Sequence, residues 1–373
     1  MSGNLFHPRR PPAAVGMPVD EVETPSLLVD LDVYEANLDR MAAAIAGKSA
    51  RLRPHAKTHR CPIIAGHQIA RGAVGVCCQT LGEAEAMVDA GIRDVLITNQ
   101  VVTPGKIRRL MTLAGRGEVK VCVDDAQNIR DLGAAAQGAG VMLRVLVEVD
   151  VGQGRCGVST PEDAIRLAGL VRETNLLIFQ GVQAYQGSIQ HVYTQSERDE
   201  AALAAIGRAR EFVDRLWGAQ LHVSIVGGGG TGSFELEAQS SVYNEIQAGS
   251  YIFMDADYRR VEGIPRRFEP ALSVVSTVLS ATAGRCVCDA GLKASSTDSG
   301  LPVVVGREGL TYVAASDEHG TLRVQGPSPR VGERIRLVPG HCDPTVNLHD
   351  YLVAVRNDRV EELWPVTARG GHL

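Results

Sequence analysis

The stretch VKVCVDDAQNIRDLGAAAQGAGVMLRVLVEVDV, residues 119–151, contains the unit from which the fold of this chain is predicted. Its two ends, 119–125 and 143–151, are short apolar runs rich in valine, which are typical of buried strands. Between them, residues 126–140 combine alanine with apolar side chains at helical spacing. A strand, a helix and a second strand in this order predict two parallel strands joined by a crossover helix, the repeating unit of α/β proteins.

The same alternation continues from residue 26 to about residue 255. Six further candidate strands are RLRPHAK (51–57), VGVCCQT (74–80), DVLITNQ (94–100), FQGVQAYQG (179–187), HVSIVGGG (222–229) and NEIQAGSYIF (244–253). Eight strands alternating with helices predict a (β/α)8 barrel, with an open doubly wound sheet as the alternative. We therefore predict an N-terminal arm over 1–23 and a barrel domain over 24–262, in which SLLVDLD (26–32) leads into the first helix.

The pattern changes after residue 262. Short β-branched runs, separated by glycine, proline, aspartate and asparagine, follow one another with no convincing helical pattern between them. They include LSVVSTVLSAT (272–282), LTYVAAS (310–316), RIRLVPGH (334–341) and YLVAVR (351–356). This pattern predicts a second, all-β domain over residues 263–373.

The composition gives no reason to propose a nucleic-acid or membrane partner. The 373 residues carry a formal net charge of -5, and no apolar run approaches the length of a membrane span. Most of the eight cysteines lie in apolar runs such as GVCCQ (75–79), as expected for buried, reduced thiols. Arg9 and Arg10 are not followed by the apolar segment of a secretion signal. We therefore expect a cytoplasmic protein.

The stretch RLRPHAKTH, residues 51–59, has a basic residue at every second position. In an extended strand these side chains share one face, which could be buried only if an anion offset their loss of water. Lys57 would end the first barrel strand, and barrel enzymes carry their sites at the carboxyl ends of the strands. Neighbouring cations lower the pKa of a lysine, and a free amine can form a Schiff base with a carbonyl. The alternative is an edge strand with solvated charges.

A candidate phosphate site follows the predicted strand that ends near residue 226. In VGGGGTGS, residues 226–233, glycines allow backbone N–H groups to close on phosphate oxygens, and Thr231 or Ser233 can add a hydroxyl. A second contact could come from QAGSY, residues 247–251. The stretch is not a Walker A loop, because no Gly-Lys-Ser/Thr follows it. The alternative is a flexible turn.

The stretch GQGRCG, residues 152–157, has the spacing of a dinucleotide-binding fingerprint. However, Thr160 and Pro161 indicate that the next helix begins after the third glycine rather than at it. We therefore interpret the stretch as a loop without a dinucleotide. Arg155 within it lies at a strand end, where a guanidinium can hold a carboxylate or phenolate.

Residues 340–350, GHCDPTVNLHD, contain a candidate metal site. If the segment is extended, His341 and Asp343 share a face, while Cys342 points away. An imidazole and a carboxylate suit Mn²⁺, Mg²⁺ or Zn²⁺, with water completing the coordination shell. A turn with a buried histidine explains the same residues equally well. His191, in QAYQGSIQH, is another candidate histidine, for which the alternative is a core or surface residue whose hydrogen bonds are satisfied.

Several longer motifs resemble the D-threonine aldolase family, which belongs to the alanine racemase-like pyridoxal-phosphate enzymes. The resemblance runs from about residue 24 to the C-terminus and rests on RPHAKTH, GVCCQTLGEAEAMVDAGIRDVLITNQVV, VEVDVGQGRCGV, QAYQGSIQH, GGGGTGS, YNEIQAGSYIFMDADY and PGHCDPTVNLHD. It implies that Lys57 carries pyridoxal phosphate, that His191 is the active-site histidine and that His341 and Asp343 bind the metal. The implied cofactor-binding residues are Lys57, Gln79, Arg155, Tyr185, Gly229, Gly230, Thr231, Gln247, Gly249 and Ser250.

The resemblance also implies an activity. The family cleaves D-3-hydroxy amino acids, such as D-threonine or 3-hydroxy-D-aspartate, to glycine and an aldehyde, with Mn²⁺ or Mg²⁺ expected before Zn²⁺, and it forms homodimers. Gln247 departs from the alanine racemases, which have an arginine beside the pyridine nitrogen. The alternatives are a dehydratase, a racemase or a non-enzymatic pyridoxal-phosphate-binding protein. The dehydratases of this family typically have cysteine two positions after the metal-binding histidine, where this chain has Asp343.

Overall fold

The computed structural model describes residues 10–264 and 267–372 of the chain. These residues form two compact units. The barrel unit comprises the described residues of 38–251, 260–268 and 370–373, and the β unit comprises those of 1–37, 252–259 and 269–369. We describe each unit by itself.

The barrel unit contains the predicted eight parallel strands, which the described residues place in the order β2-β9-β8-β7-β6-β5-β4-β3. Their bounds are β2 Arg51–Leu52, β3 Val76–Cys78, β4 Asp94–Gln100, β5 Glu118–Val123, β6 Leu143–Glu148, β7 Leu177–Gln183, β8 Ile225–Gly228 and β9 Glu245–Ile246. A parallel bridge between His55 and Cys77 joins the two ends of this order. Two backbone hydrogen bonds support it, from Val74 N to Leu52 O at 2.9 Å and from Cys77 N to Pro54 O at 2.8 Å. The sheet therefore closes, and the barrel prediction is confirmed over the open sheet.

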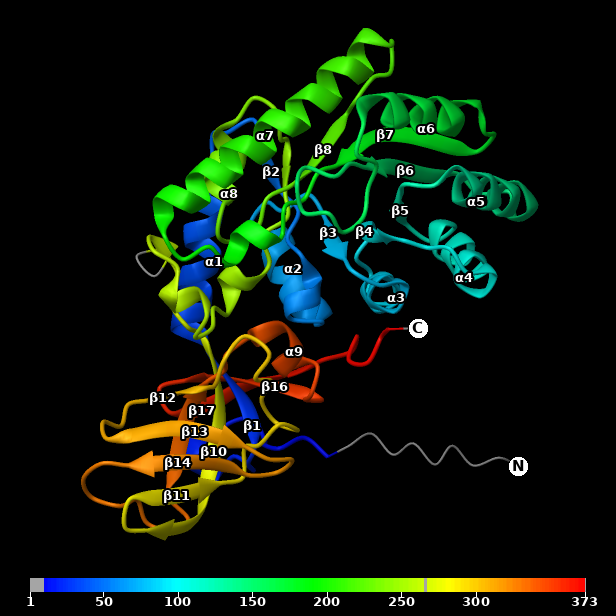
Figure 1. Ribbon diagram of the computed structural model, residues 1–373. Helices are drawn as coiled ribbons and strands as arrows, with labels where there is room; N and C mark the ends of the chain where they lie inside the picture. The colour runs from blue at the N-terminus through cyan, green and yellow to red at the C-terminus, as the bar shows by residue number, and fades with distance from the viewer. Residues whose placement is uncertain (1–9, 265–266, 373) are drawn as a thin grey trace, which may run out of the picture. The chain divides into compact units, whose positions relative to one another are not determined.

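Helices alternate with these strands, and α3 to α6 lie outside β4 to β7 (Figure 1). The helices are α1 Leu31–Ile45, α2 Pro62–Ala70, α3 Leu81–Asp89, α4 Pro104–Ala114, α5 Ala126–Ala139, α6 Pro161–Glu173, α7 Gln195–Gly218 and α8 Phe234–Gln239. Polar caps fix several starts: Asp125 accepts a hydrogen bond from Asn128 N at 2.9 Å, and Thr160 accepts one from Asp163 N at 3.2 Å. The sequence analysis did not predict α2 and α8; α8 has only six residues, too few for a helical apolar spacing to stand out.

The stretch RLRPHAKTH is not extended along its whole length, contrary to the prediction. Strand β2 contains only Arg51 and Leu52, and residues 56–58 form the 3₁₀ turn η2 (Ala56–Thr58). The Nδ1 atom of His55 accepts a hydrogen bond from Lys57 N at 3.4 Å, which caps this turn. Lys57 therefore lies on a turn just beyond the strand, and the basic side chains do not share one face.

Arg53 has protein carboxylates as partners rather than a ligand. Its side chain is 2% exposed. Its Nε and Nη2 donate to both oxygens of Glu245, at 2.7 and 2.9 Å, and its Nη1 donates to Asp94 Oδ1 at 2.6 Å. Lys120 Nζ donates to the same Asp94 oxygen at 2.7 Å. Glu245 and Asp94 begin β9 and β4, so this network lies at the amino-terminal end of the barrel, which in such folds serves stability.

Replacing Arg53 should therefore cost stability rather than activity. We expect Arg53→Met to lower the free energy of unfolding by about 3–5 kcal/mol, because it leaves the mostly buried Glu245 carboxylate without its partner and removes one of the two cations bound to Asp94. Urea unfolding followed by circular dichroism measures this change. In the control, Arg71→Met removes a 2.6 Å ion pair to Asp39 whose side chains are 30% and 68% exposed, and it should cost less than about 1 kcal/mol. Equal effects of the two variants would contradict the prediction.

The β unit is built on one nine-stranded sheet of the described residues. Its elements are β1 Ser26–Asp30, β10 Leu272–Thr282, β11 Arg285–Cys288, β12 Val303–Val305, β13 Leu310–Ala315, β14 Gly320–Val324, β15 Arg334–Val338, α9 Cys342–Val346, β16 Tyr351–Arg356 and β17 Arg359–Pro365. The predicted C-terminal strands are confirmed. The short helix α9 was not predicted, and it corrects the extended reading of residues 340–350. Pro344 lies in its first turn, where proline is tolerated.

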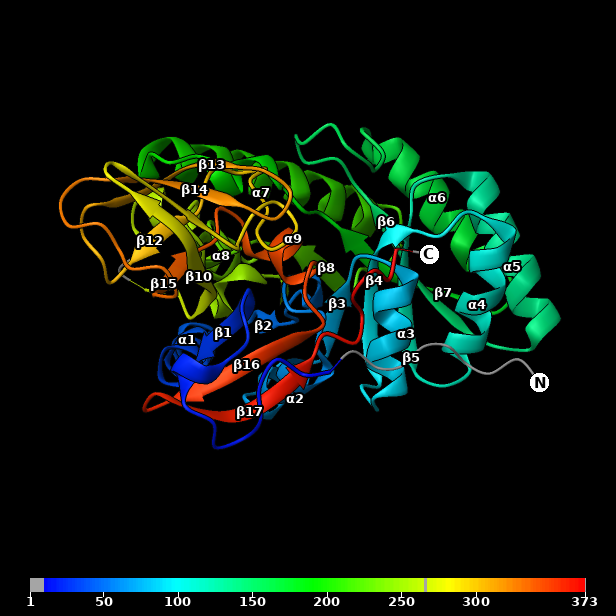
Figure 2. The same cartoon turned by 90° about the horizontal axis from the view of Figure 1, so that it is seen from below.

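The amino-terminal residues belong to this β unit, which changes the predicted boundaries at residues 24 and 262. Strand β1 pairs antiparallel with β10 and parallel with β16 (Figure 2), rather than opening the barrel. Ahead of it, Val19 and Val22 are buried with Leu28 and Val275 in one apolar cluster. The described part of the predicted arm is therefore packed and not flexible, while residues 1–9 lie outside the described residues.

The cysteines agree with the prediction of buried, reduced thiols. All eight cysteines are free thiols, and all except Cys156 are buried. Burial raises the pKa of Cys77, Cys78 and Cys122 on the barrel strands, so these thiols stay protonated. Among the described residues, no helix is both long and apolar enough to cross a membrane.

Candidate active site

The carboxyl ends of the barrel strands bring together the segments that carry the predicted cofactor-binding residues. Lys57 follows β2, Gln79 follows β3, and Tyr185 lies two residues beyond β7. Gly229, Gly230 and Thr231 follow β8, and Gln247, Gly249 and Ser250 follow β9. Arg155 lies in the loop after β6. Because parallel strands end at one rim of a barrel, residues far apart in the sequence share this rim.

Two hydrogen bonds of His55 fix the turn that presents Lys57. Its Nδ1 accepts from Lys57 N, so Nε2 carries the proton and donates to Thr98 Oγ1 at 3.0 Å. Burial, together with the charge of Lys57, holds the pKa of His55 well below its usual range. His55 is therefore a neutral residue that orients the turn and adds no charge beside Lys57.

A buried ion pair from α3 supports the same turn, and the sequence analysis missed it. Glu83 is fully buried, and its carboxylate lies 3.0 Å from Arg60, just after the Lys57 turn. Its Oε2 also accepts from Gln79 N at 2.7 Å. The motif Thr80-x-x-Glu83 is a capping-box pattern, which was the available signal for this residue. Glu83 thus joins the segment after Lys57 to the segment of Gln79.

The glycine-rich segment after β8 fits a phosphate group. Gly229 has φ of +77°, a conformation that residues with side chains rarely adopt. Beside the segment that follows β9, the hydroxyl Oγ1 of Thr58 is buried and has no hydrogen-bond partner among the described residues. A Cβ on Gly249 would lie 2.7 Å from this hydroxyl, so only glycine leaves the space beside it. A buried donor without a partner, beside a glycine, is what an anionic group would satisfy.

The loop after β6 confirms the interpretation of GQGRCG as a loop. Asp150 Oδ1 accepts from Gly152 N at 2.9 Å and from Gly154 N at 3.0 Å, which holds the loop in a tight turn. Helix α6 begins only after Thr160. Arg155 is exposed, and its guanidinium carbon lies 5.9 Å from the centroid of the Tyr185 ring. The structure therefore brings Arg155 and Tyr185 together at the rim.

Gln247 is held by a second buried glutamine. Gln183 Nε2 donates to Gln247 Oε1 at 2.6 Å, and Gln247 Nε2 donates to Gln183 Oε1 at 2.9 Å. A Cβ on Gly227 would lie 2.5 Å from the Gln247 amide, so this pair also requires a glycine on β8. This pair of amides is neutral, so it brings no charge to the carboxyl ends of β7 and β9.

Glu148, at the carboxyl end of β6, is a further titratable group that the sequence analysis missed. Its side chain is buried, and Gln100 Nε2 donates to its Oε2 at 2.6 Å. Burial raises the pKa of Glu148 to about 7, although Gln100 and the charge of Arg155 oppose the shift. Nothing in the local sequence VEVDV distinguishes it from a surface glutamate, because its environment comes from neighbouring strands.

This raised pKa predicts a pH dependence of stability. The folded chain holds the Glu148 proton up to about pH 7, whereas the unfolded chain loses it near the ordinary value of 4.5. The folded state therefore binds more protons between these values, and the stability contribution of this group falls by about 3 kcal/mol as the pH rises across the window. Glu148→Gln removes this dependence and keeps an acceptor for Gln100.

Urea unfolding of both proteins at pH 5 and at pH 8 measures the effect. We expect the variant to gain stability relative to the wild type on going from pH 5 to pH 8. A stability difference that is the same at both pH values would contradict the raised pKa.

His191 is exposed at the end of the short 3₁₀ helix η3 (Ser188–His191), between β7 and α7. An exposed histidine at the end of a barrel loop is accessible to a substrate. Its role as the active-site histidine stays a prediction.

The predicted metal ligands lie in the β unit, at the start of α9. His341 is the residue before the helix, and its Nδ1 lies 2.8 Å from Asp298 Oδ2. Burial works against its charged form, but the carboxylates of Asp343 and Asp298 raise the pKa of His341 above its usual value. Cys342 is fully buried, and its Sγ lies 3.4 Å from Asp343 Oδ1, so its side chain does not point away from Asp343 as the extended reading predicted. Among the described residues, no group of three or more histidine, cysteine or carboxylate side chains is placed to hold an ion.

Comparison with known proteins identifies the family. The chain matches the family models described as "Alanine racemase, N-terminal domain", over residues 29–257, and "Putative serine dehydratase domain", over residues 271–355. It is 46% identical over 368 residues to the 3-hydroxy-D-aspartate aldolase of Paracoccus denitrificans (strain Pd 1222), covering 96% of this chain and 95% of the relative. It is 47% identical over 364 residues to the D-threonine aldolase of an Arthrobacter species, covering 96% of each.

The solved structures agree. The crystal structure of D-threonine aldolase from Filomicrobium marinum matches with a TM-score of 0.95 and 47% identity, over 97% of this chain and 100% of that one. The D-threo-3-hydroxyaspartate dehydratase of a Delftia species is only 28% identical, over 92% of this chain and 97% of the relative. The fold and the rim residues therefore define an alanine racemase-like barrel protein. Within that class, the chain belongs to the D-threonine aldolase family.

Proposed function

We propose that this protein is a pyridoxal-phosphate- and divalent-metal-dependent aldolase that cleaves D-3-hydroxy amino acids to glycine and an aldehyde. The observation that carries the proposal is the 46–47% identity to two aldolases over nearly the whole chain, which includes the rim residues described above. Both aldolases are named for D-3-hydroxy amino acids, and both release glycine if the Cα–Cβ bond breaks. Acetaldehyde would be the second product from D-threonine, and glyoxylate from 3-hydroxy-D-aspartate.

Each rim residue has a role in this proposal. Lys57 Nζ holds the cofactor through its aldehyde carbon, on the turn fixed by His55 and Glu83. The hydroxyls of Thr58 and Thr231, with the backbone N–H groups of Gly229 and Gly230, hold the phosphate. Arg155 would supply a guanidinium for the phenolate oxygen. Tyr185, Gln79 and Gln247 would line the cofactor, and Gly249 and Ser250 would add contacts to the phosphate.

The cleavage makes one bond and breaks two on the substrate. His191 removes the proton of the 3-hydroxyl group, the hydroxyl oxygen forms a carbonyl with Cβ, and the Cα–Cβ bond breaks. The chemistry that pyridoxal phosphate supplies when bound is an electron sink for the pair left at Cα. A proton added at Cα then gives glycine.

His341 and Asp343 would hold the divalent ion, with Asp298 orienting the imidazole through Nδ1. The donor set of one imidazole and one carboxylate fits Mn²⁺ or Mg²⁺ with water as the other ligands, and Zn²⁺ less well. The ion would supply Lewis acidity that favours loss of the hydroxyl proton. We also propose that the protein is a cytoplasmic homodimer, which light scattering of the purified protein tests for the oligomeric state.

Product analysis tests the proposed function. The purified protein with pyridoxal phosphate and Mn²⁺ is incubated in turn with D-threonine, 3-hydroxy-D-aspartate and D-serine, with L-threonine as the stereochemical control. We expect glycine and an aldehyde from one or both of the first two, and no cleavage of L-threonine. Keto acid and ammonia without glycine would instead identify a dehydratase.

A further inference from the structure

Three hydrogen bonds and the backbone of residues 190–192 form a closed ring that includes His191. The ring passes through Gly232 of the glycine-rich segment, where one side chain binds the backbone N–H and another binds the carbonyl. Gln190 Oε1 accepts from Gly232 N at 2.7 Å, and Arg198 Nε donates to Gly232 O at 2.9 Å. Arg198 Nη1 also donates to Val192 O at 2.8 Å. We call Gln190, Gly232, Arg198 and Val192 the His191 ring, because Gly232 and Arg198 connect the residue before His191 to the residue after it.

Gln190 uses its whole amide in this arrangement. It is 1% exposed, and its Nε2 donates to Ser233 Oγ at 2.8 Å and to Gln186 O at 3.2 Å. A Cβ on Gly230 would lie 2.4 Å from Gln190 Oε1, so the glycine at 230 is required by this side chain. Gln190 therefore fixes the position of Gly230 and Gly232 relative to η3.

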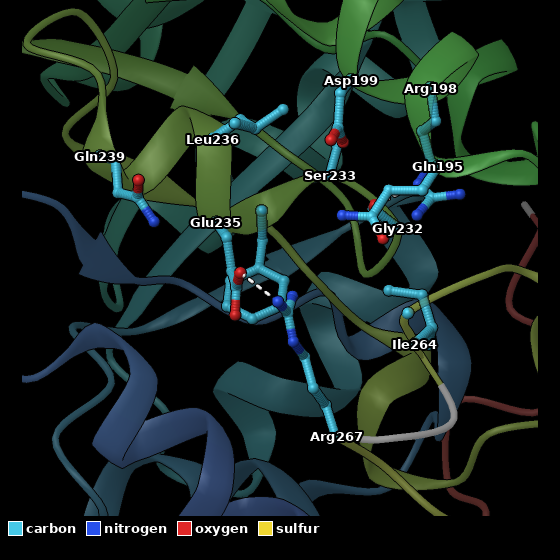
Figure 3. A pocket seen from close by; sticks show the side chains of 12 residues that line it. Gln195, Arg198, Asp199, Gly232, Ser233, Glu235, Leu236, Gln239, Ile264 and Arg267 are labelled. Carbon is cyan, nitrogen blue, oxygen red and sulfur yellow. Dashed lines mark hydrogen bonds and ion pairs between the residues drawn. The ribbon is translucent and has the colours of Figure 1, made fainter.

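Arg198 is the other half of the ring. It extends from α7 to the loop at Gly232 (Figure 3) and is 3% exposed. Besides Gly232 and Val192, its guanidinium donates to Glu262 O at 2.6 Å and to Tyr193 O at 3.4 Å. A buried guanidinium that binds only backbone carbonyls in this way orders the segments that it joins, because each carbonyl would otherwise lack a partner.

We propose that Gln190 and Arg198 are positioning residues that couple occupation of the phosphate site to the placement of His191. This inference rests on the proposed function. Gly230 and Thr231 would hold the phosphate, and the next residue, Gly232, is held through both its N–H and its carbonyl by the ring. A shift of the glycine-rich segment is therefore transmitted to the backbone at Gln190 and Val192, on both sides of His191.

The test is a double-mutant cycle with a separate binding measurement. Arg198→Lys keeps the charge but loses the fork of donors that binds three segments. We expect it to lower kcat about 10- to 100-fold with little change in KM, since a small displacement of the base is enough for such a loss. Combined with His191→Ala, the same change should lower kcat by less than about 2-fold further, because Arg198 acts through His191.

The binding measurement follows the absorption of pyridoxal phosphate titrated into the full-length protein freed of cofactor. Arg198→Lys should weaken cofactor binding about 5-fold or more, whether or not His191 is present. Gln190→Met removes three hydrogen bonds and should reproduce the loss of kcat and the weaker cofactor binding. It is a second, independent variant in case Arg198→Lys does not fold. Arg208→Lys is the matched control, because Arg208 lies on the same helix but is exposed and donates a long hydrogen bond to Ser159 O, at 3.4 Å.

Two results would overturn the coupling: an equal loss of kcat from Arg198→Lys with and without His191, or an unchanged cofactor affinity in both Arg198→Lys and Gln190→Met. The single variant His191→Ala tests the proposed function separately. If His191→Ala keeps full kcat, His191 is not the base, and the proposed coupling to the base fails. The effect of the His191 ring on cofactor affinity is still decided by the titration.

Discussion

Lys57→Ala is expected to lower the rate of glycine formation at least about 10³-fold, because it removes the amine that holds the cofactor through its aldehyde carbon. In the wild type, borohydride reduction followed by peptide mapping should place the phosphopyridoxyl group on Lys57. In the variant this label should be absent. Added ethylamine should restore part of the activity, because a free amine can take the place of the missing side chain only if the rest of the site is intact.

Lys293→Ala is the matched control for this prediction. The Lys293 side chain is 66% exposed and pairs with Glu318 and Asp317 in the β unit, so its loss should change neither labelling nor rate. A label on Lys293, or a wild-type protein without any label, would remove the assignment of Lys57. It would also remove the physical interpretation of the His55 and Glu83 contacts around the turn.

The second large effect is expected at His341 and Asp343. Chelation of divalent ions, His341→Ala and Asp343→Ala should each lower cleavage at least about 10²-fold, because the metal is needed to acidify the substrate hydroxyl. The absorption of the bound cofactor should stay unchanged in all three cases, since Lys57 and the phosphate contacts lie in the barrel unit. Stopped assays with defined Mn²⁺ and an absorption spectrum of the same sample measure both quantities.

The variants separate the roles of the ligands from those of their neighbours. Asp298→Asn should weaken metal binding about 10-fold or more while leaving activity at saturating Mn²⁺, because Asp298 orients His341 and is not a proposed ligand. Asp317→Ala, which removes an exposed carboxylate of the same unit, serves as the control. Full cleavage activity in buffer shown by elemental analysis to be free of metal would overturn the metal-dependent mechanism.

The strands of this chain could be predicted because their signals are local. Apolar β-branched runs such as VKVCVDD and LRVLVEVDV indicate buried strands wherever they pair, and their alternation with helices predicted the closed barrel. The environment of Arg53 and Lys57 could not be predicted from the alternating basic pattern. Arg53 is bound by Asp94 and Glu245, which lie far away in the sequence, and Lys57 leaves the strand because His55 binds its backbone N–H.

The candidate site shows the same division. Lys57, the glycine-rich segment and Arg155 carry chemistry that is visible in the sequence, and the strand order brings them to one rim. Glu83, Glu148, Gln183 and Arg198 were missed, because their roles depend on burial and on partners contributed by other elements. A single sequence contains no signal for a glutamate that becomes buried between strands, nor for an arginine whose partners are backbone carbonyls.

The pairing of β1 has a consequence for how the chain folds during synthesis. β1 leaves the ribosome before the barrel strands, yet both of its neighbours, β10 and β16, begin roughly 240 and 320 residues later. At ordinary rates of translation, β1 has no sheet partner for roughly 10–50 s, whereas the barrel strands emerge in the order in which they pair. The barrel can therefore form co-translationally, and the β unit is completed only after the barrel has been synthesised. During that interval the apolar SLLVD segment has neither of its sheet partners and is open to chaperones and to aggregation.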